Sequence, residues 1–435
     1  MIVKICGAYI ITPLRNEISV EKKDIFIEDG IVRFAPPNES PDRIIDVAGN
    51  VILPGLVNTH NHIYSTLSKG IPCDAPFGDF SGNLKKLWWV LDSSLSKEDM
   101  ILSTVIALRE SIKNGVTTIF DHHISGYAEN ALSDIAEVFD SFGISGALAF
   151  ETSDRNGADF FEKSLYENIR FTESQKGKSV QGMIGLHASF TLSDSSMKAI
   201  AYTSDNYPIH VHVGEGKIDV ADCMEKYGIG LMERFREFNL LRDNSLFVHC
   251  SNCTDEDLEI LSRKNVFIAQ AVDSNLNNGL HVGDIAKFIE KGIRTTAGTD
   301  GMHSNVLKAM KNSMLVSKCL NRNCDIGYRE MKTLLLSSYE IKTSFGNPLG
   351  IVEGEPADLA IFDYNPALEL NDENFLSHFI YGITESRCRY VVKRDTLLLD
   401  DYHLSDNPLD EILDDAEEIV TELFRKFEAN KGKYR

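Results

Sequence analysis

The strongest constraint on the fold is an alternation of short apolar runs and longer amphipathic stretches between residues 56 and 300. The short runs are typical of strands, and the amphipathic stretches are typical of helices. Eight strands separated by helices over about 245 residues match the rhythm of a (β/α)8, or TIM-type, barrel. The predicted strands are Val57–His60, Thr117–His122, Ser145–Phe150, Gly182–His187, Tyr207–His212, Leu246–His249, Val266–Ala269 and Thr295–Gly298. The predicted helices include Lys97–Asn114, Asn130–Phe142, Asp219–Phe238 and Thr254–Lys264.

Both ends of the chain have a different, strand-rich pattern. Ile2–Ile11 and Asp46–Ile52 are strand-like, and Asp24–Phe34 predicts a hairpin with its turn at Asp29-Gly30. Strand patterns return in Gly350–Pro366, as two strands around a turn, and in Arg389–Asp400. We therefore predict an α/β protein with a barrel at 56–346, a small β-sandwich domain from 1–55 and 347–402, and a terminal helix at 408–430.

The composition excludes several classes of function. The chain has 44 Lys and Arg against 65 Asp and Glu, a formal charge of −21. This balance argues against nucleic acid or an anionic membrane as a partner. Eight irregularly spaced cysteines do not indicate a disulfide framework, and neither a signal peptide nor an apolar run of about 18 residues is present. We expect a cytoplasmic protein.

Histidines mark the ends of the predicted strands. His60 and His62 are two residues apart, so in a strand both side chains point to the same side and reach one ion. His212 and His249 end the fifth and sixth strands, and Asp300 follows the eighth. Catalytic groups of such barrels converge at the carboxyl ends of the strands. A metal site there is favoured over a set of unrelated polar residues.

Other histidines have weaker signals. His122 and His123 are adjacent and point to opposite faces of a strand, so they cannot both face a metal; a site role for His122 is the minority interpretation. We interpret four more as ordinary polar residues, although His303 is near enough to Asp300 to line a pocket. These four are His281, His303, His378 and His403.

Four ordered motifs give the chain a family resemblance: residues 51–62 (VILPGLVNTHNH), 210–215 (HVHVGE), 246–250 (LFVHC) and 296–301 (TAGTDG). With them, the chain resembles the mononuclear deaminase branch of the amidohydrolase superfamily. The closing segment GIVEGEPADLAIFDYNP also resembles the family. Stretches such as NTHNHIYSTLSKGI, FETSDRN and DSNLNN resemble SsnA-like aminohydrolases.

The resemblance implies residue roles. His60, His62, His212 and Asp300 would hold one divalent metal ion, with Zn²⁺ favoured and Fe²⁺ the alternative. Glu215 would shuttle protons, and His249 and Asp300 would orient the attacking water. His187 would contact the substrate. The fourth strand contains no lysine for a bridging carboxylate, which favours one metal over two.

Two regions bear on the substrate. Where many relatives have a histidine after the seventh strand, this chain has Gln270, a candidate substrate contact that leaves the nucleobase open. Residues 63–92 predict a lid that carries both tryptophans, Trp88 and Trp89. Trp89 is a candidate aromatic wall for a planar ring, with helix packing as the equal alternative; Asp92 is a weaker candidate.

The sequence therefore predicts an enzyme that deaminates a small heterocyclic amine, such as a purine or pyrimidine, and releases ammonia. The same site could act on another leaving group, namely chloride, an alkylamine or a formimino nitrogen. A non-catalytic scaffold is a third, less favoured hypothesis because the ligand set is complete. A homodimer is left open, since nothing in the sequence marks an interface.

Overall fold

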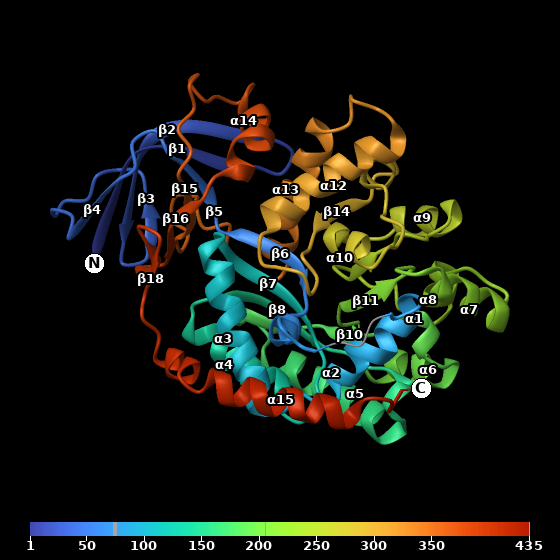
Figure 1. Cartoon of the computed structure of the whole chain (residues 1–435). Helices are drawn as coiled ribbons and strands as arrows, with labels where there is room; N and C mark the ends of the chain where they lie inside the picture. Colours follow the sequence, from blue (N-terminus) through green and yellow to red (C-terminus); the bar gives the residue numbers. More distant parts are fainter. Residues whose placement is uncertain (73–75, 205, 435) are drawn as a thin grey trace.

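A computed structural model describes residues 1–72, 76–204 and 206–434. Two parallel sheets form its centre, with helices around them (Figure 1). The first contains β6 (Leu56–Asn61), β7 (Val116–His123), β8 (Ser145–Phe150) and β9 (Val180–Gly182). The second contains β10 (Ile184–Leu186), β11 (Ile209–Val213), β12 (Leu246–His249), β13 (Phe267–Gln270) and β14 (Arg294–Ala297). The predicted α/β class with parallel strands is confirmed.

Isolated parallel bridges join the two sheets at both edges. One connects Thr152, after β8, with Leu186 of β10. The other connects Asn61 of β6 with Asp300, which follows β14. The carboxyl ends of β6 and β14 therefore lie side by side, and so do the residues that follow them.

The predicted fourth strand, Gly182–His187, is wrong as a single strand. It divides between β9 and β10 because the chain changes its hydrogen-bonding partner in the middle. Met183 N donates to Leu148 O of β8, whereas Ile184 N donates to Pro208 O beside β11. The sequence pattern records burial on both sides of the segment and does not record this change of partner.

Strands from both chain ends share one mixed sheet, in which β5 and β15 pair antiparallel. Figure 1 shows these blue and orange-red strands together at one side of the molecule. Among the described residues its strands are β1 (Ile2–Pro13), β2 (Ile18–Glu28), β3 (Ile31–Arg33), β4 (Arg43–Asp46), β5 (Val51–Pro54), β15 (Asp358–Phe362), β16 (Cys388–Lys393), β17 (Thr396–Asp400) and β18 (His403–Leu404).

Two strand predictions at the chain ends need correction. Asp46–Ile52 is not one strand, because a turn at residues 48–49 separates β4 from β5. Gly350–Pro366 contains one strand, β15, rather than two. The hairpin predicted at Asp24–Phe34 is confirmed as β2 and β3, with Asp29 and Gly30 both at positive φ in the turn.

The helices cover the outer faces of the parallel sheets. Asp257 caps α9 reciprocally with Thr254: Asp257 N donates to Thr254 Oγ1, and Asp257 Oδ2 accepts from Thr254 N. The longer helices are α3 (Lys97–Lys113), α4 (Ala131–Ser141), α5 (Ala158–Ser174), α6 (Asp194–Thr203), α7 (Lys217–Tyr227), α12 (Val306–Asn321), α13 (Tyr328–Ser344) and α15 (Ala416–Asn430). The shorter ones are α8 (Leu231–Glu237), α9 (Asp255–Ser262), α10 (Val272–Asn277), α11 (Ile285–Glu290) and α14 (Phe375–Tyr381).

Two predicted helices are interrupted. Asp219–Phe238 divides into α7 and α8 because Gly228 adopts φ 68° and ends α7. The predicted helix at 408–430 begins with a short 3-10 helix, Pro408–Leu413, and continues as α15.

The segment predicted as a lid follows β6. Its described residues form a 3-10 helix at Ile63–Ser68, α1 (Phe80–Asn83), a π-helical turn at Leu84–Trp88 and α2 (Trp89–Asp92). The uncertain residues 73–75 of this predicted segment lie outside the described residues.

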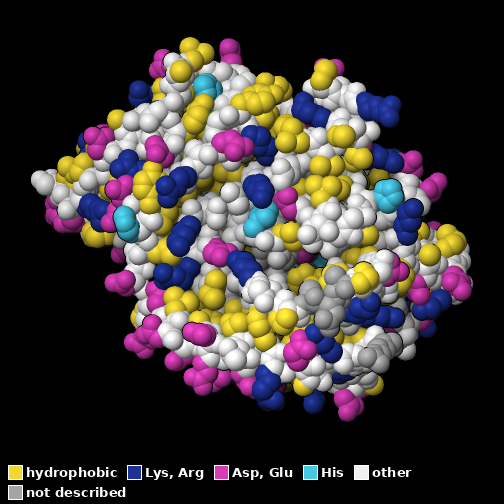
Figure 2. All heavy atoms as spheres, in the orientation of Figure 1, with side chains coloured by type: hydrophobic (Ala, Val, Ile, Leu, Met, Phe, Trp, Pro, Cys, Tyr) yellow, Lys and Arg dark blue, Asp and Glu magenta, His cyan; other side chains and the backbone are white. Residues whose placement is uncertain are grey.

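The surface is mixed in charge. Figure 2 shows acidic and basic side chains interspersed over the face that it draws. In the described part of the chain, every helix is too short or too polar to cross a bilayer.

Candidate metal and active site

His60 and His62 enter the site from the carboxyl end of β6. The alternation along the strand turns both imidazoles toward the space above the parallel sheets. His60 is fully buried, and its Nδ1 lies 2.9 Å from Nε2 of His210. His62 Nδ1 lies 2.7 Å from the carbonyl oxygen of His122, so it must be the protonated nitrogen.

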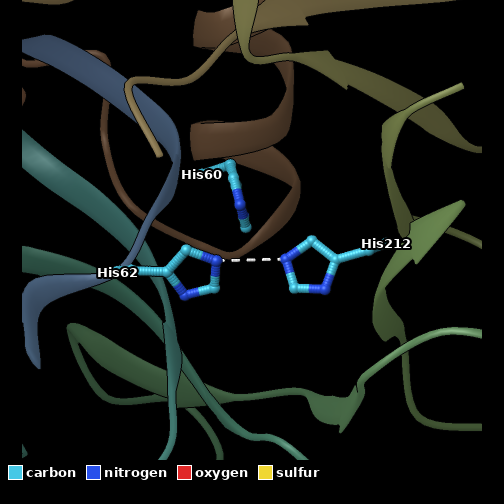
Figure 3. A group of neighbouring side chains, drawn as sticks. All are labelled: His60, His62 and His212. Carbon is cyan, nitrogen blue, oxygen red and sulfur yellow. Dashed lines mark hydrogen bonds between the residues drawn. The ribbon is translucent and has the colours of Figure 1, made fainter. Parts of the chain in front are cut away.

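His212, from β11, faces His62. Its Nδ1 donates to the carbonyl oxygen of His187 at 2.9 Å, which leaves Nε2 with its lone pair. Burial and the neighbouring imidazoles hold the pKa of His212 well below its usual value, so the ring is neutral. The Nε2 atoms of His62 and His212 lie 3.1 Å apart, with His60 pointing to the space between them (Figure 3). This close approach of ring nitrogens from two strands suits a cation held between the rings.

Asp300 completes a set of four donors. Its carboxylate oxygens lie 3.9 Å from His60 Nε2 and 3.6 Å from His62 Nε2. Ligands about 2.1 Å from a tetrahedral ion lie roughly 3.4 Å from one another. His60 Nε2 is buried and has no hydrogen-bond partner. Three imidazole nitrogens and one carboxylate thus fit a divalent metal ion.

Glu215 and His249 lie beside this set. His249 Nε2 is 3.6 Å from Glu215 Oε2 and 3.7 Å from Asp300 Oδ2, and His249 Nδ1 donates to Asn275 Oδ1. Burial, followed by the charges of Asp300 and Asp219, raises the pKa of Glu215 well above its usual value. A buried carboxyl group with a raised pKa beside a potential metal site is a candidate for general acid–base catalysis.

Hydrogen bonds from Asn252 fix the backbone at Glu215. The Asn252 side-chain amide donates to the carbonyl oxygens of Gly214 and Glu215, at 2.8 and 3.0 Å. Glu215 is therefore held in place directly after β11. This arrangement links residues from β11 and from the loop after β12.

The site opens into a cavity of about 70 Å³. Trp88, Trp89 and His187 are among its lining residues, as are Glu215 and Asp300. Trp89 lies in α2 and also lines the cavity, and its role as an aromatic wall for a planar ring stays a prediction. A wider cavity of about 840 Å³ adjoins the first one and shares four lining residues with it: Phe80, Trp88, Asn277 and Asn278.

Three other candidates lie away from the metal-binding atoms. Gln270 is fully buried, its side-chain nitrogen and oxygen have no partner, and it is absent from the cavity lining among the described residues. The structure therefore does not bring Gln270 to the cavity wall. His281 lines the wider cavity and not the inner one, and His303, in the loop that follows Asp300, lies 3.2 Å from Asp273.

His122 points into the interior and packs near His62 and His212, with ring centroids 5.6 and 4.7 Å away. Its Nε2 approaches the carbonyl oxygens of Leu186 and His210. His122 Nδ1, Glu151 and His212 also form a potential three-residue metal group. That group shares His212 with the first one, and Arg155 lies 2.7 Å from Glu151, so a second cation there is disfavoured.

A buried charge cluster at the cavity was missed by the sequence analysis. Arg155 forms ion pairs with Asp92 at 2.8 Å and with Glu151 at 2.7 Å, and all three side chains are at most 6% exposed. Arg155 and Glu151 also line the cavity. The available signal was a charged pair in FETSDRN, directly after a predicted strand; only Asp92 had been considered.

Comparison with known proteins agrees with this geometry. The chain is 26% identical over 435 residues to a 5'-deoxyadenosine deaminase of Methanosarcina barkeri, covering 97% of this chain and 98% of the relative. It is 26% identical over 360 residues to a 5-methylthioadenosine/S-adenosylhomocysteine deaminase of Pyrococcus furiosus, covering 80% and 84%. A crystal structure of an adenosine deaminase from Xanthomonas campestris with bound zinc superposes with a TM-score of 0.83, at 18% identity over 97% of this chain and 98% of that one.

These comparisons confirm the predicted superfamily and the prediction of a hydrolase. The model of the amidohydrolase family matches residues 51–395, which contain every proposed metal-binding residue. Because the match spans most of the 435 residues, the chain belongs to the amidohydrolase family.

Proposed function

We propose that this protein is a hydrolytic deaminase with one divalent metal ion, which converts the C–NH₂ group of a heterocycle to a carbonyl and releases ammonia. The observation that carries the proposal is the convergence of the Nε2 atoms of His62 and His212 beside Asp300 and Glu215. His60, His62, His212 and Asp300 would hold the ion. Zn²⁺ suits this donor set best, with Fe²⁺ as the alternative.

The chain's own residues supply the rest of the mechanism. A divalent ion, when bound, would lower the pKa of a water molecule from about 16 toward 7. Glu215 would take one proton from the attacking water and deliver it to a ring nitrogen as the C–O bond forms. The remaining hydroxyl proton would then pass to the amino nitrogen, so that the C–N bond breaks, ammonia leaves and the carbon becomes a carbonyl. His249 and Asp300 orient the attacking oxygen through hydrogen bonds. His187 and Trp89 contact the heterocycle from the cavity wall.

We infer that the substrate is a purine nucleoside rather than a free base. The two relatives described above are named for substrates in which adenine carries a substituted ribose. The small inner cavity accommodates a planar ring, and the adjoining cavity of about 840 Å³ leaves room for a sugar and its substituent. Several side-chain amides line this outer space, among them Asn83, Asn252, Asn277 and Asn278, which suits an uncharged polar group.

The finer details of the fold belong to the same proposal. The bridges at both sheet edges support closure of the parallel strands into one (β/α)8 barrel at 56–346. The terminal strands would form a small β-sandwich domain from 1–55 and 347–402. An apolar cluster of residues from both segments, including Ile25, Ile52 and Leu359, supports this division.

Ammonia release tests the function. Zinc- or iron-loaded protein should release ammonia from one member of a panel of adenosines, aminopurines, aminopyrimidines and aminotriazines. Glu215→Gln should abolish release while the metal content stays near one ion per chain. Glu225→Gln, an exposed change on α7, serves as the matched control. If Glu215→Gln loses its metal, Glu215 is a ligand and not the proton shuttle. If the metal-loaded protein releases no ammonia, the deaminase proposal is wrong. The candidate leaving group is then chloride, an alkylamine or a formimino nitrogen.

A further inference from the structure

The last helix, α15, packs along the outside of the helices that carry the cavity wall. Two of its own side chains, Leu423 and Phe427, are fully buried on its inner face. In Figure 1 the red helix runs past α3 and ends near α2, and α15 contacts both. Residues far apart in the sequence, 416–434 and 89–99, therefore meet behind the cavity.

Polar contacts fix the end of α15 to the chain just after α2. Lys426 Nζ donates to Asp99 Oδ2 at 3.0 Å and to Ser96 Oγ at 3.1 Å. Asn430 Nδ2 donates to Ser94 Oγ at 2.9 Å. These bonds direct the residues that follow the helix toward Trp89.

Tyr434, which follows α15, contacts both Trp89 and Asn156. Its ring lies 5.7 Å from the Trp89 ring, at 72°, in an edge-to-face arrangement. Its hydroxyl donates to Asn156 Oδ1 at 2.8 Å. Asn156 follows Arg155, whose guanidinium lies 5.2 Å from the Trp89 ring. One side chain thus joins the tryptophan and the loop of the buried arginine.

The Trp89 indole depends on such ring contacts for its orientation. Its Nε1 is buried and has no hydrogen-bond partner among the described residues. The neighbours that touch the ring are Tyr434, Arg155 and His187, the last at 6.2 Å between centroids. Tyr434 is the member of this group that does not line the inner cavity.

We propose that Tyr434 is a positioning residue, which braces Trp89 and the Arg155–Asn156 loop from behind and so sets the width of the inner cavity. It acts through Trp89 and does not touch the substrate. The proposal rests on the proposed function only in taking the inner cavity as the substrate site.

Tryptophan fluorescence tests the brace without any substrate. The chain contains two tryptophans, so Trp88→Phe leaves Trp89 as the sole emitter. In that background, Tyr434→Ala should shift the emission to longer wavelength and increase quenching by acrylamide. Tyr434→Phe keeps the ring contact and should retain most of the original spectrum. Tyr202→Ala, at a tyrosine that is 90% exposed, is the matched control.

Kinetics test the consequence for the site. With native Trp88, Tyr434→Ala should raise KM by about 2- to 10-fold, the range of an aromatic pair contact, and leave kcat within about 2-fold. Tyr434→Phe should restore most of the KM. An unchanged Trp89 spectrum overturns the brace, and so does a changed spectrum with an unchanged KM. If no substrate is found, the spectra still decide whether Tyr434 orders Trp89, so the two proposals fail separately.

Discussion

Two groups of three buried charges lie at opposite ends of the same strand, β8. Lys393 Nζ donates to Ser145, the first residue of β8, and pairs with Asp358 together with Lys342. At the other end, Glu151 directly follows the strand and pairs with Arg155, which also pairs with Asp92. The first group joins α13 to the terminal sheet, and two members of the second group, Glu151 and Arg155, line the cavity.

The two groups differ in how fully their hydrogen bonds are satisfied. Asp358 Oδ2 accepts from both lysines, at 2.8 and 2.6 Å, and Lys342 also donates to Leu349 O. Each group has a buried carboxylate oxygen without a hydrogen-bond partner among the described residues, Asp358 Oδ1 in the first and Asp92 Oδ1 in the second, but the cavity group also has two unpaired donors, Arg155 Nε and Nη1. Buried polar groups are normally paired, so these unpaired donors set the cavity group apart from the junction group.

The pKa values separate the groups in the same way. Burial alone would raise the pKa of Asp358, but the two lysines outweigh it and hold the value at about 2. Burial raises the pKa of Glu151 to about 7, although Arg155 opposes the shift. At the junction the two lysines keep the Asp358 carboxylate ionised. At the cavity, burial raises the pKa of Glu151 into the range where the carboxyl group can gain or lose a proton.

The largest expected effect is on stability at the junction. Asp358→Asn leaves two buried ammonium groups without a counter-ion and should lower the free energy of unfolding by about 3–5 kcal/mol. Urea unfolding followed by circular dichroism measures it. The folded fraction should keep its kcat/KM, because the cavity lies at the other end of β8. A loss below about 1 kcal/mol would contradict the comparison.

At the cavity we expect a substitution to have a large effect on activity and a smaller effect on stability. Arg155→Gln should lower kcat/KM by about 100-fold, because the wall formed with Trp89 loses its geometry. Its effect on unfolding should be smaller than that of Asp358→Asn, since the freed carboxyl groups can bind protons. Parallel kinetics and urea unfolding of both variants provide the test. A larger stability loss for Arg155→Gln than for Asp358→Asn would make the cavity cluster a structural one.

Acid titration sharpens the contrast further. The pKa of Asp358 falls from 3.8 to about 2 on folding, so its stabilisation is fully present above about pH 4 and is lost as the pH falls through 2. The wild-type protein should therefore lose about 2 kcal/mol of its advantage over Asp358→Asn in that window. Unfolding curves at closely spaced pH values measure the gap. A gap that is constant down to pH 2 would mean that folding does not lower the pKa of Asp358.

An exposed ion pair on α15 should have the smallest effect on the free energy of unfolding. Glu422 and Arg425 form an ion pair on α15 at 2.7 Å, with side chains 46% and 71% exposed. Solvent screens such pairs, so Glu422→Gln should leave the urea midpoint unchanged within error. A clear shift would show that exposure alone does not distinguish weak pairs from strong ones in this protein.

Sequence reasoning worked best where a local period carries the information. The two-residue period along β6 predicted that His60 and His62 share a side, and the structure brings both to His212 and Asp300. The strand-ending histidines were recognisable because the alternation of strands and helices is itself local. The same logic was wrong for Gly182–His187, where a change of pairing partner breaks a continuous apolar run.

Long-range packing accounts for the rest. Gln270 seemed a substrate contact by its position after a strand, yet its side chain lies buried away from the cavity wall. Nothing local linked Arg155 to Asp92, 63 residues away, or Tyr434 to Trp89. The sequence by itself predicted the α/β architecture and the shared side of His60 and His62, because each depends on neighbours within one strand or helix. Only the tertiary structure decided which buried charges are hydrogen-bonded and which line the cavity. Burial and pairing depend on residues that are far apart in the sequence and meet only in the folded chain.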